Sequence, residues 1–125
     1  MIPIQSPNAP AAIGPYSQAV RAKNLLFLSG QIPIDPKTGQ LVQGTIEQET
    51  NQVLDNLDAV LREAGISLAR VVKTTIYLTD LADFQKVNET YGRRFSGTFP
   101  ARATVQVSAL PKGARVEIDA IATLD

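Results

Sequence analysis

Two amphipathic helical segments on either side of one strand-like run constrain the fold most strongly. The first begins at Thr45, a good N-cap residue, with Gln48 placed three residues later to complete a capping box. It ends near Gly65, a residue typical of helix C-termini. The second begins at Asp80 and ends before Gly97 and Pro100. Apolar or small residues recur with helical spacing in both segments: Ile46, Thr50, Val53, Leu54, Leu57, Val60, Leu61 and Ala64 in the first, and Leu81, Phe84, Val87, Tyr91 and Phe95 in the second.

The remaining segments predict strands and turns. Apolar, β-branched and alternating runs predict five strands, at residues 17–20, 25–28, 70–78, 102–107 and 115–123. We expect a hairpin between the first two, and antiparallel pairing of the last two through Pro111–Gly113. The proline-rich residues 1–12 predict an extended lead-in, and residues 34–44 predict turns. The order β-β-α-β-α-β-β is typical of an α+β fold with two helices on one face of a mixed sheet.

Length and charge narrow the class of protein. A chain of 125 residues predicts a single domain over residues 1–125. Twelve basic and twelve acidic side chains cancel, so the chain lacks the basic patch typical of nucleic-acid binding. The N-terminal segment has no signal-peptide pattern, and no apolar run is long enough for a membrane span. We therefore expect a soluble cytoplasmic protein without nucleic-acid or membrane partners.

The absence of cysteine and histidine limits the chemistry further. It excludes a thiolate nucleophile, a Ser-His-Asp triad and the commonest transition-metal ligands. No glycine-rich phosphate loop is present, and no carboxylates cluster at metal-ligand spacing. We expect neither a cofactor nor a metal. Any catalysis depends on carboxylates, Arg, Lys, hydroxyls or the backbone.

The predicted sheet has apolar residues on both faces. Both alternating sets of residues 25–28 are apolar, and Val71 and Tyr77 lie in the set opposite Val72, Ile76 and Leu78. Two helices cover only one face of the sheet. We therefore expect a second copy of the chain to cover the other face, with site residues at the interface between the copies. A partly apolar exposed face is the alternative.

Two charged residues stand out among the strand residues. Arg102, at the start of a strand, can bind a carboxylate through two N–H donors. The alternative is an ordinary charged residue of an edge strand that extends into water. Glu117 lies opposite Val116 and Ile118 in the alternation, and can position a water or form a salt bridge to Arg102 or Arg115.

Four further residues are candidate ligand contacts. Tyr16 follows a turn, Ser29 and Gly30 end a strand, and Asn88 interrupts the apolar stripe of the second helix. Each also has a structural interpretation: packing for Tyr16, a bulge for Ser29 and Gly30, and a hydrogen bond for Asn88.

Several segments together resemble the Rid proteins, the YjgF-type reactive-imine deaminases. These segments are 9–17, 29–33, 50–57, 72–75, 88–91, 100–105, 108–111 and 116–118, and the similarity extends from about Asn8 to Ala122. The resemblance implies a chorismate-mutase-like fold and a homotrimer with three clefts between subunits. It also implies cofactor-independent hydrolysis of 2-iminopropanoate and 2-iminobutanoate to 2-oxo acids and ammonia.

Family residues carry over to particular positions. The resemblance implies that Arg102 binds the substrate carboxylate, that Glu117 handles the water, and that Tyr16, Ser29, Gly30 and Asn88 line the cleft. Thr104, also expected in the cleft, stands where many members have cysteine, which removes thiol chemistry without removing the arginine and glutamate.

Two other functions remain open at this stage. One is a non-catalytic trimeric module that binds 2-oxo acids, which would not need Glu117. The other is RNA cleavage or inhibition of translation, which the zero net charge and the lack of histidine argue against.

Overall fold

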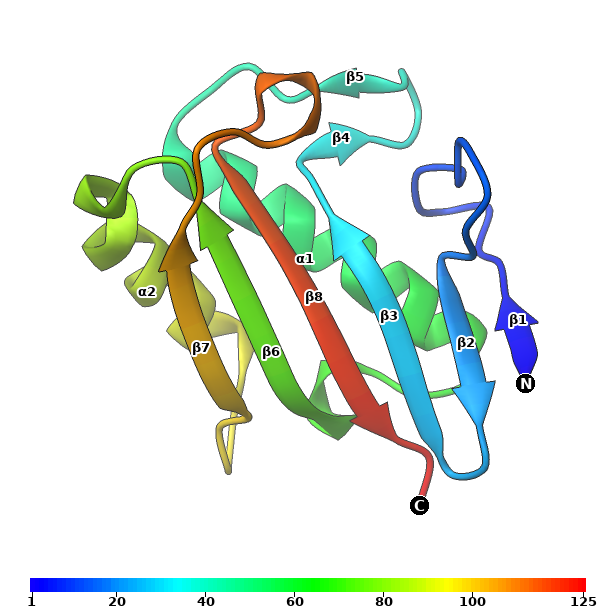
Figure 1. Ribbon diagram of the computed structural model, residues 1–125. Helices are drawn as coiled ribbons and strands as arrows, with labels where there is room; N and C mark the ends of the chain where they lie inside the picture. The colour runs from blue at the N-terminus through cyan, green and yellow to red at the C-terminus, as the bar shows by residue number, and fades with distance from the viewer.

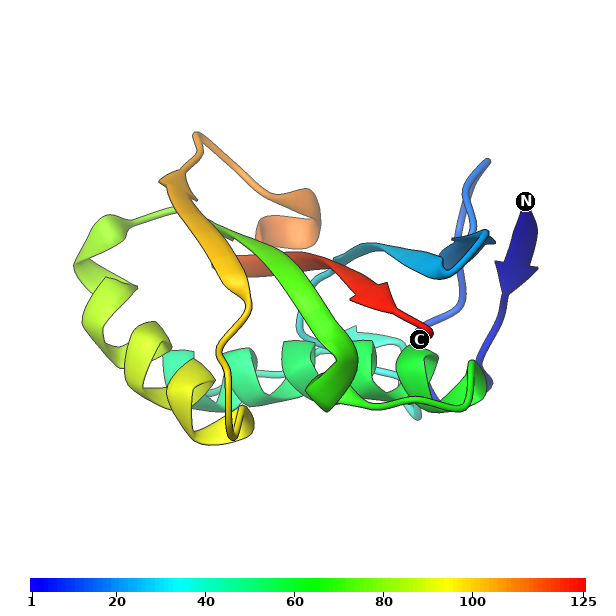
Figure 2. The ribbon, with the colours of Figure 1, turned by 90° about the horizontal axis from the view of Figure 1, so that it is seen from below.

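A computed structural model describes residues 1–125 as a six-stranded mixed sheet with two helices on one face (Figures 1 and 2). The sheet has the order β1-β2-β3-β8-β6-β7, and its other face carries no helix. The strands are β1 (Ile2–Ile4), β2 (Ala19–Ala22), β3 (Leu25–Gln31), β6 (Val71–Leu78), β7 (Ala101–Gln106) and β8 (Val116–Thr123). The remaining elements are α1 (Ile46–Glu63), α2 (Phe84–Arg94), the hairpin β4 (Ile34–Asp35) and β5 (Gln40–Leu41), and the short 3-10 turns η1 (Leu68–Arg70), η2 (Leu81–Asp83) and η3 (Pro111–Gly113).

The predicted α+β architecture with a mixed sheet and two helices is confirmed, with two small additions. The lead-in contains β1, which pairs with β2 at the sheet edge. The segment predicted as turns contains the β4–β5 hairpin. The predicted hairpin of β2 and β3 is present, with Lys23 in the left-handed region at its turn. Neither helix is long and apolar enough to cross a membrane.

The first helix begins where its capping box predicts. The Thr45 hydroxyl accepts a hydrogen bond from the Gln48 backbone N–H at 3.2 Å, and the Gln48 side chain accepts one from the Thr45 N–H at 2.9 Å. Gly65 follows the helix with φ of 81°, a conformation that favours glycine. The reciprocal bonds satisfy two donors that a helix N-terminus otherwise leaves without a partner.

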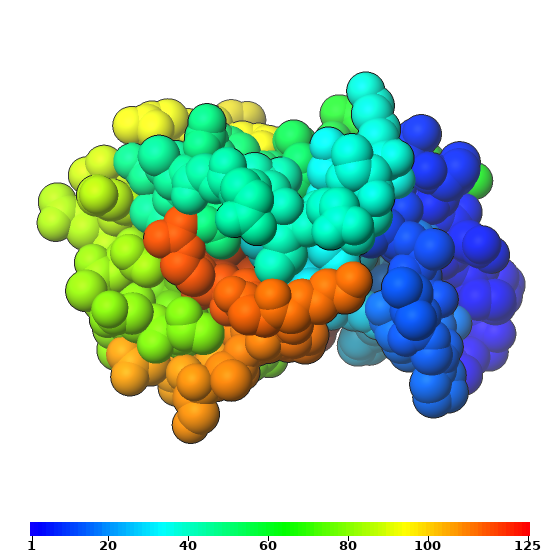
Figure 3. All heavy atoms as spheres, turned by 90° about the horizontal axis from the view of Figure 1, so that it is seen from above, coloured from blue at the N-terminus to red at the C-terminus, as the bar shows by residue number.

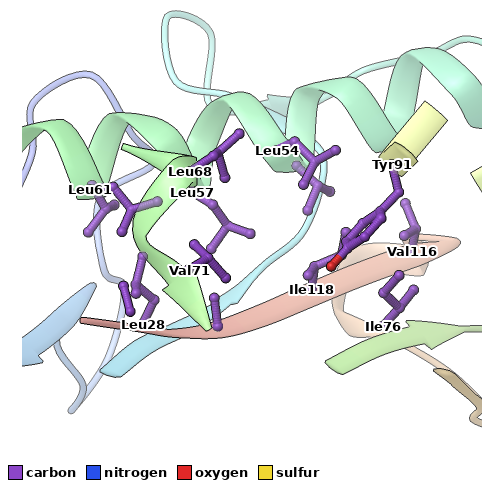
Figure 4. Packing of buried hydrophobic residues seen from close by; sticks show 14 of the residues in the cluster. Leu28, Leu54, Leu57, Leu61, Leu68, Val71, Ile76, Tyr91, Val116 and Ile118 are labelled. Atoms are coloured by element: carbon purple, nitrogen blue, oxygen red, sulfur yellow. The ribbon is translucent and has the colours of Figure 1, made fainter. Parts of the chain in front are cut away.

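The core lies between α1, α2 and the sheet (Figure 4). Leu54, Leu57 and Leu61 of α1 are buried and point towards the sheet, where Leu28, Ile76 and Ile118 belong to the same cluster. Each fully buried aliphatic side chain contributes about 1.5–3 kcal/mol relative to exposure. This packing fixes which face of β8 points inward, and therefore which face carries Glu117.

The predicted antiparallel pairing of the last two strands is wrong. β7 pairs in parallel with β6, whereas β8 lies between β3 and β6 and pairs antiparallel with both. The inward side chains of β8 are all buried, which fits a strand in the middle of the sheet: these are Val116, Ile118, Ala120 and Ala122. β7 is mostly exposed and suits an edge.

The second helix starts later than its stripe predicts. Asp80 caps η2 by accepting a hydrogen bond from the Ala82 N–H, and α2 begins only at Phe84. Val87, Tyr91 and Phe95 are buried as predicted, whereas Leu81 and Phe84 are exposed. The first turn of the predicted stripe therefore lies outside the core.

The sheet face without helices displays apolar side chains, as predicted. Phe27 on β3 and Val105 on β7 are 40% and 42% exposed. A register irregularity in β6 between Val71 and Lys73 changes one detail, because it buries Val71 and exposes Val72. The prediction had assigned these two residues to the opposite faces.

Candidate functional site

Four chain segments enclose a hollow of about 480 Å³ on the sheet face without helices. Figure 3 shows the notch between the N-terminal segment, in blue, and the η3 turn, in orange. Tyr16, Ser29, Gly30 and Glu117 all line it, so the structure brings four of the seven predicted site residues together. The lining also includes Pro10, Ala11, Ile13, Gln18, Gln31, Ile32, Ile34, Pro111 and Lys112.

Glu117 lies on β8 directly beside Gly30 of β3. The pairing of these strands is irregular between Leu28 and Gln31, which identifies a bulge at Ser29 and Gly30. A Cβ atom at Gly30 would lie 2.9 Å from Cδ of Glu117 and 3.1 Å from its Cγ. Glycine at this position therefore leaves the space that the carboxylate occupies.

The surroundings of the Glu117 carboxyl favour its protonated form. Burial raises its pKa above the ordinary value, and the negative charge of Asp119 raises it further. The proposed salt bridges to Arg102 and Arg115 are absent. Arg115 instead donates to Glu49 at 2.8 Å and to the Gly44 carbonyl at 2.9 Å. A carboxyl with a raised pKa and no cationic partner suits proton transfer.

Hydrogen bonds hold the Tyr16 segment against the sheet. The Ser29 hydroxyl donates to the Ser17 carbonyl at 2.6 Å, and the Gln18 carbonyl accepts from the Ser29 N–H at 2.9 Å. The buried Gln18 amide also donates to the Pro10 carbonyl at 2.8 Å. Tyr16 itself is 53% exposed, so its ring forms an open wall of the hollow.

A second hollow, of about 440 Å³, contains Arg102 and Asn88. The Arg102 guanidinium carbon lies 5.1 Å from the centre of the Tyr91 ring and 5.7 Å from that of Phe84. The Tyr91 hydroxyl is hydrogen-bonded to Thr74 at 2.7 Å, which fixes the ring. Stacking on two aromatic rings orients a guanidinium while leaving donors free for a carboxylate.

Thr104 shares the Arg102 face of β7, as alternation requires. In the parallel β6–β7 pair, Arg102 is opposite Thr74 and Thr104 is opposite Ile76, both of which point towards the helices. The buried Thr104 hydroxyl oxygen has no hydrogen-bond partner. Thr104 lines neither of the two hollows. It lies two residues after Arg102 on the same face of β7.

The two groups of predicted residues lie on opposite faces of the sheet. Arg102 points towards α2, whereas Glu117 points away from the helices. Within one copy of the chain, therefore, Arg102 and Glu117 cannot contact one small substrate together. Each hollow provides half of the chemistry that the sequence predicted for one cleft.

Sequence reasoning missed three residues at these hollows. Lys112 lines the Glu117 hollow and has φ of 58°, a backbone conformation that no pattern predicts for lysine. Tyr91 and Phe84 contact Arg102, although both were predicted only as parts of the core stripe. No His, Cys, Asp or Glu residues cluster in threes as a metal site requires.

The sequence and the fold both match one class of protein over almost the whole chain. The family model described as Endoribonuclease L-PSP matches residues 6–124, and the chain belongs to this family, the Rid (YjgF-type) proteins. A mouse relative named 2-iminobutanoate/2-iminopropanoate deaminase is 53% identical, over 95% of this chain and 88% of the relative.

Two solved structures share the fold. One, from Thermotoga maritima and named a putative endoribonuclease, has a TM-score of 0.97 at 52% identity, and covers 100% of this chain and 98% of its own. The other is TdcF from E. coli with bound serine, with a TM-score of 0.93 at 39% identity and 98% coverage of both chains.

Proposed function

We propose that the protein hydrolyses 2-imino acids to 2-oxo acids and ammonia, at sites formed between subunits of a homotrimer. The observation that carries this proposal is the division of the site. A stacked arginine and a proton-holding carboxyl lie in separate hollows on opposite faces of one sheet. A second copy that places its Arg102 hollow against the Glu117 hollow completes a cleft with both groups. The mouse relative's name supports the substrate class.

The proposed reaction needs only groups that this cleft would contain. Arg102 binds the substrate carboxylate through two N–H donors and so places C2 of the imine near Glu117. Glu117 accepts a proton from a water while the water oxygen bonds to C2 of the protonated imine and the C=N electrons move to nitrogen, which gives a carbinolamine. The proton on Glu117 then passes to the amine nitrogen. As the C–N bond breaks and ammonia leaves, Glu117 takes the remaining hydroxyl proton and the C2 carbonyl forms.

The open face of the sheet supports assembly. Phe27, Val72 and Val105 are each at least 40% exposed on one molecule, which is typical of a surface that another copy covers. The number of subunits, three, comes from the family resemblance alone. Sedimentation at micromolar concentration is expected to show a trimer, and a stable monomer would contradict both the assembly and the shared cleft.

Imine hydrolysis fits the charges of the hollows better than cleavage of RNA, which the family description names. Lys112 is the one cationic side chain that lines the Glu117 hollow, and Arg102 is the one that lines the second hollow. A nucleic-acid site needs several cations to bind successive phosphates. One arginine beside an open hollow fits a single carboxylate instead.

The experiment that tests this proposal mixes two inactive variants. Arg102→Ala is expected to lose both 2-oxobutanoate binding and turnover, by about two orders of magnitude. Glu117→Gln is expected to lose about 10²–10⁴-fold in turnover while still binding 2-oxobutanoate. Imine is generated by a threonine dehydratase, and semicarbazide trapping reports how much survives.

Unfolding and refolding the two variants together produces mixed assemblies. If the site is shared, about a quarter of the sites combine an intact Arg102 with an intact Glu117 from another subunit. The mixture is then expected to recover about a quarter of the wild-type activity. No recovery from mixed trimers that are shown to form would contradict the shared site. Wild-type turnover by Glu117→Gln alone would contradict the role of Glu117.

A further inference from the structure

A hydrogen-bonded pair lies beside Glu117 on the open face, outside both hollows. The Tyr77 hydroxyl donates to Asp119 Oδ2 at 2.9 Å. Asp119 follows Glu117 by two residues on β8, and Tyr77 is the cross-strand partner of Glu117 on β6. All three side chains are half-buried and point to the same face. The pair therefore lies next to the candidate catalytic carboxyl without lining either hollow.

We propose that Asp119 and Tyr77 are positioning residues for Glu117: the Tyr77 hydroxyl holds the Asp119 carboxylate in place, so that its negative charge acts on the neighbouring Glu117 carboxyl from a fixed position. The inference rests on the proposed function, in which Glu117 accepts a proton from water. It adds two residues that line neither hollow.

The geometry makes the charge of Asp119 effective. Residues two apart on a strand are about 6.6 Å apart and share a face. At that distance a carboxylate in a half-buried setting disfavours the ionisation of its neighbour. In agreement, the Asp119 charge is, after burial, the second cause of the raised pKa of Glu117.

Tyr77 provides a donor that stays protonated. Its hydrogen bond to Asp119, followed by burial, raises the pKa of the Tyr77 hydroxyl above its ordinary value. A neutral phenol cannot cancel the charge of Asp119, as a lysine or arginine partner would. It can only fix the position of that charge, which a positioning role requires.

Other ionisable groups face this region and enter the test. Lys73 lies on the same face of β6, four residues before Tyr77. Tyr16 and Lys112 line the hollow that contains Glu117. In the proposed assembly, Arg102 of another subunit also approaches Glu117. All of these groups remain in the variants below, so a difference between variants isolates Asp119 or Tyr77.

The direct test is a titration of the Glu117 carboxyl by ¹³C NMR, in protein labelled at the glutamate side chains. Glu117→Gln identifies the signal. In Asp119→Asn, the pH at which Glu117 ionises is expected to fall by about half to one unit. In Tyr77→Phe it is expected to fall by less, because the charge remains but is no longer held. Glu63→Gln, which removes an exposed charge at the end of α1, is expected to leave the titration unchanged.

Activity provides the second measurement. In Asp119→Asn, the acidic limb of the kcat/KM profile is expected to move to lower pH with the titration, and the plateau rate to fall about two- to fivefold. The titration needs no substrate, so it tests the charge effect even if imine hydrolysis is not found. An unchanged Glu117 titration in correctly assembled Asp119→Asn would overturn the proposal. An unchanged titration in Tyr77→Phe would remove Tyr77 from it.

Discussion

Replacing Gly30 by alanine tests the most demanding contact of the site. The added Cβ would lie 2.9 Å from Cδ and 3.1 Å from Cγ of Glu117. Oε2 of Glu117 would lie closer to the Cβ than either carbon, and non-bonded atoms ordinarily approach no closer than about 3.5 Å, so the carboxylate must move by roughly 1 Å or rotate away. A displacement of that size at a reacting group costs about 10²-fold in rate. We therefore expect Gly30→Ala to lose about two orders of magnitude in imine hydrolysis.

The same substitution is expected to leave the fold intact. Gly30 is not in the left-handed region, so its backbone accommodates alanine. The atoms that must yield belong to the end of one flexible side chain. The free energy of unfolding is therefore expected to change by less than about 1 kcal/mol. Chemical denaturation measures this directly, beside the semicarbazide-trapping assay for activity.

Gly44 offers a matched control. A Cβ there would lie 3.0 Å from Cδ of Gln48, in the capping box of α1 and away from both hollows. Gly44→Ala is expected to cost about 0.5–2 kcal/mol of stability with little loss of turnover. The reasoning about Gly30 is refuted if Gly30→Ala retains more than about a third of the wild-type activity. It is also refuted if Gly30→Ala lowers turnover by the same factor in a Glu117→Gln background. An effect that acts through the Glu117 carboxylate should be smaller once that carboxylate has been removed.

Three further predictions concern the charged groups and their neighbours. Because the folded state raises the pKa of Glu117, ionisation of Glu117 opposes folding. The protonated carboxyl makes its full contribution to stability below the pKa of the unfolded state, and this contribution is lost as the pH rises through the pKa of the folded state. Glu117→Gln is therefore expected to melt about one to four degrees higher than wild type at pH 7, with no difference near pH 3, and a lower melting temperature at pH 7 would contradict the shift. Tyr91→Leu removes the stacking on Arg102 and is expected to weaken 2-oxobutanoate binding about three- to tenfold by calorimetry, whereas Tyr91→Phe, which keeps the ring, should lose less than half of that effect. Thr104→Ser and Thr104→Cys are expected to stay within tenfold of wild-type turnover, since the Thr104 hydroxyl has no partner to lose, and a near-total loss would show that this oxygen takes part.

Local sequence signals predicted where helices and strands lie in the chain better than which strands lie side by side in the sheet. Thr45, Gln48 and Gly65 located α1 because capping is decided within a few residues. The central position of β8 was not predicted, since alternation shows which face is buried but not which strands lie alongside. The exposure of Phe84 was missed because helical spacing shows which face of a helix is apolar but not how much of that face the rest of the fold covers.

The faces on which the candidate site residues lie were predicted, but not the arrangement of these residues. Alternation correctly placed Glu117 opposite the core residues, and Thr104 with Arg102. The need for glycine at position 30 became visible only with the distances to Glu117, because turn, bulge and close contact all favour the same residue type. The contacts of Arg102 with α2 depend on β7 pairing with β6, which no local pattern determines.

The central place of β8 also has a consequence for how the polypeptide is made. Val116–Thr123 joins β3 to β6, two strands that have no hydrogen bonds to each other. During synthesis, both strands therefore present unpaired edges until more than nine-tenths of these 125 residues have been translated. A nascent chain that stalls before Val116 lacks both the middle of the sheet and Glu117, so the sheet and the candidate site become complete in the same step.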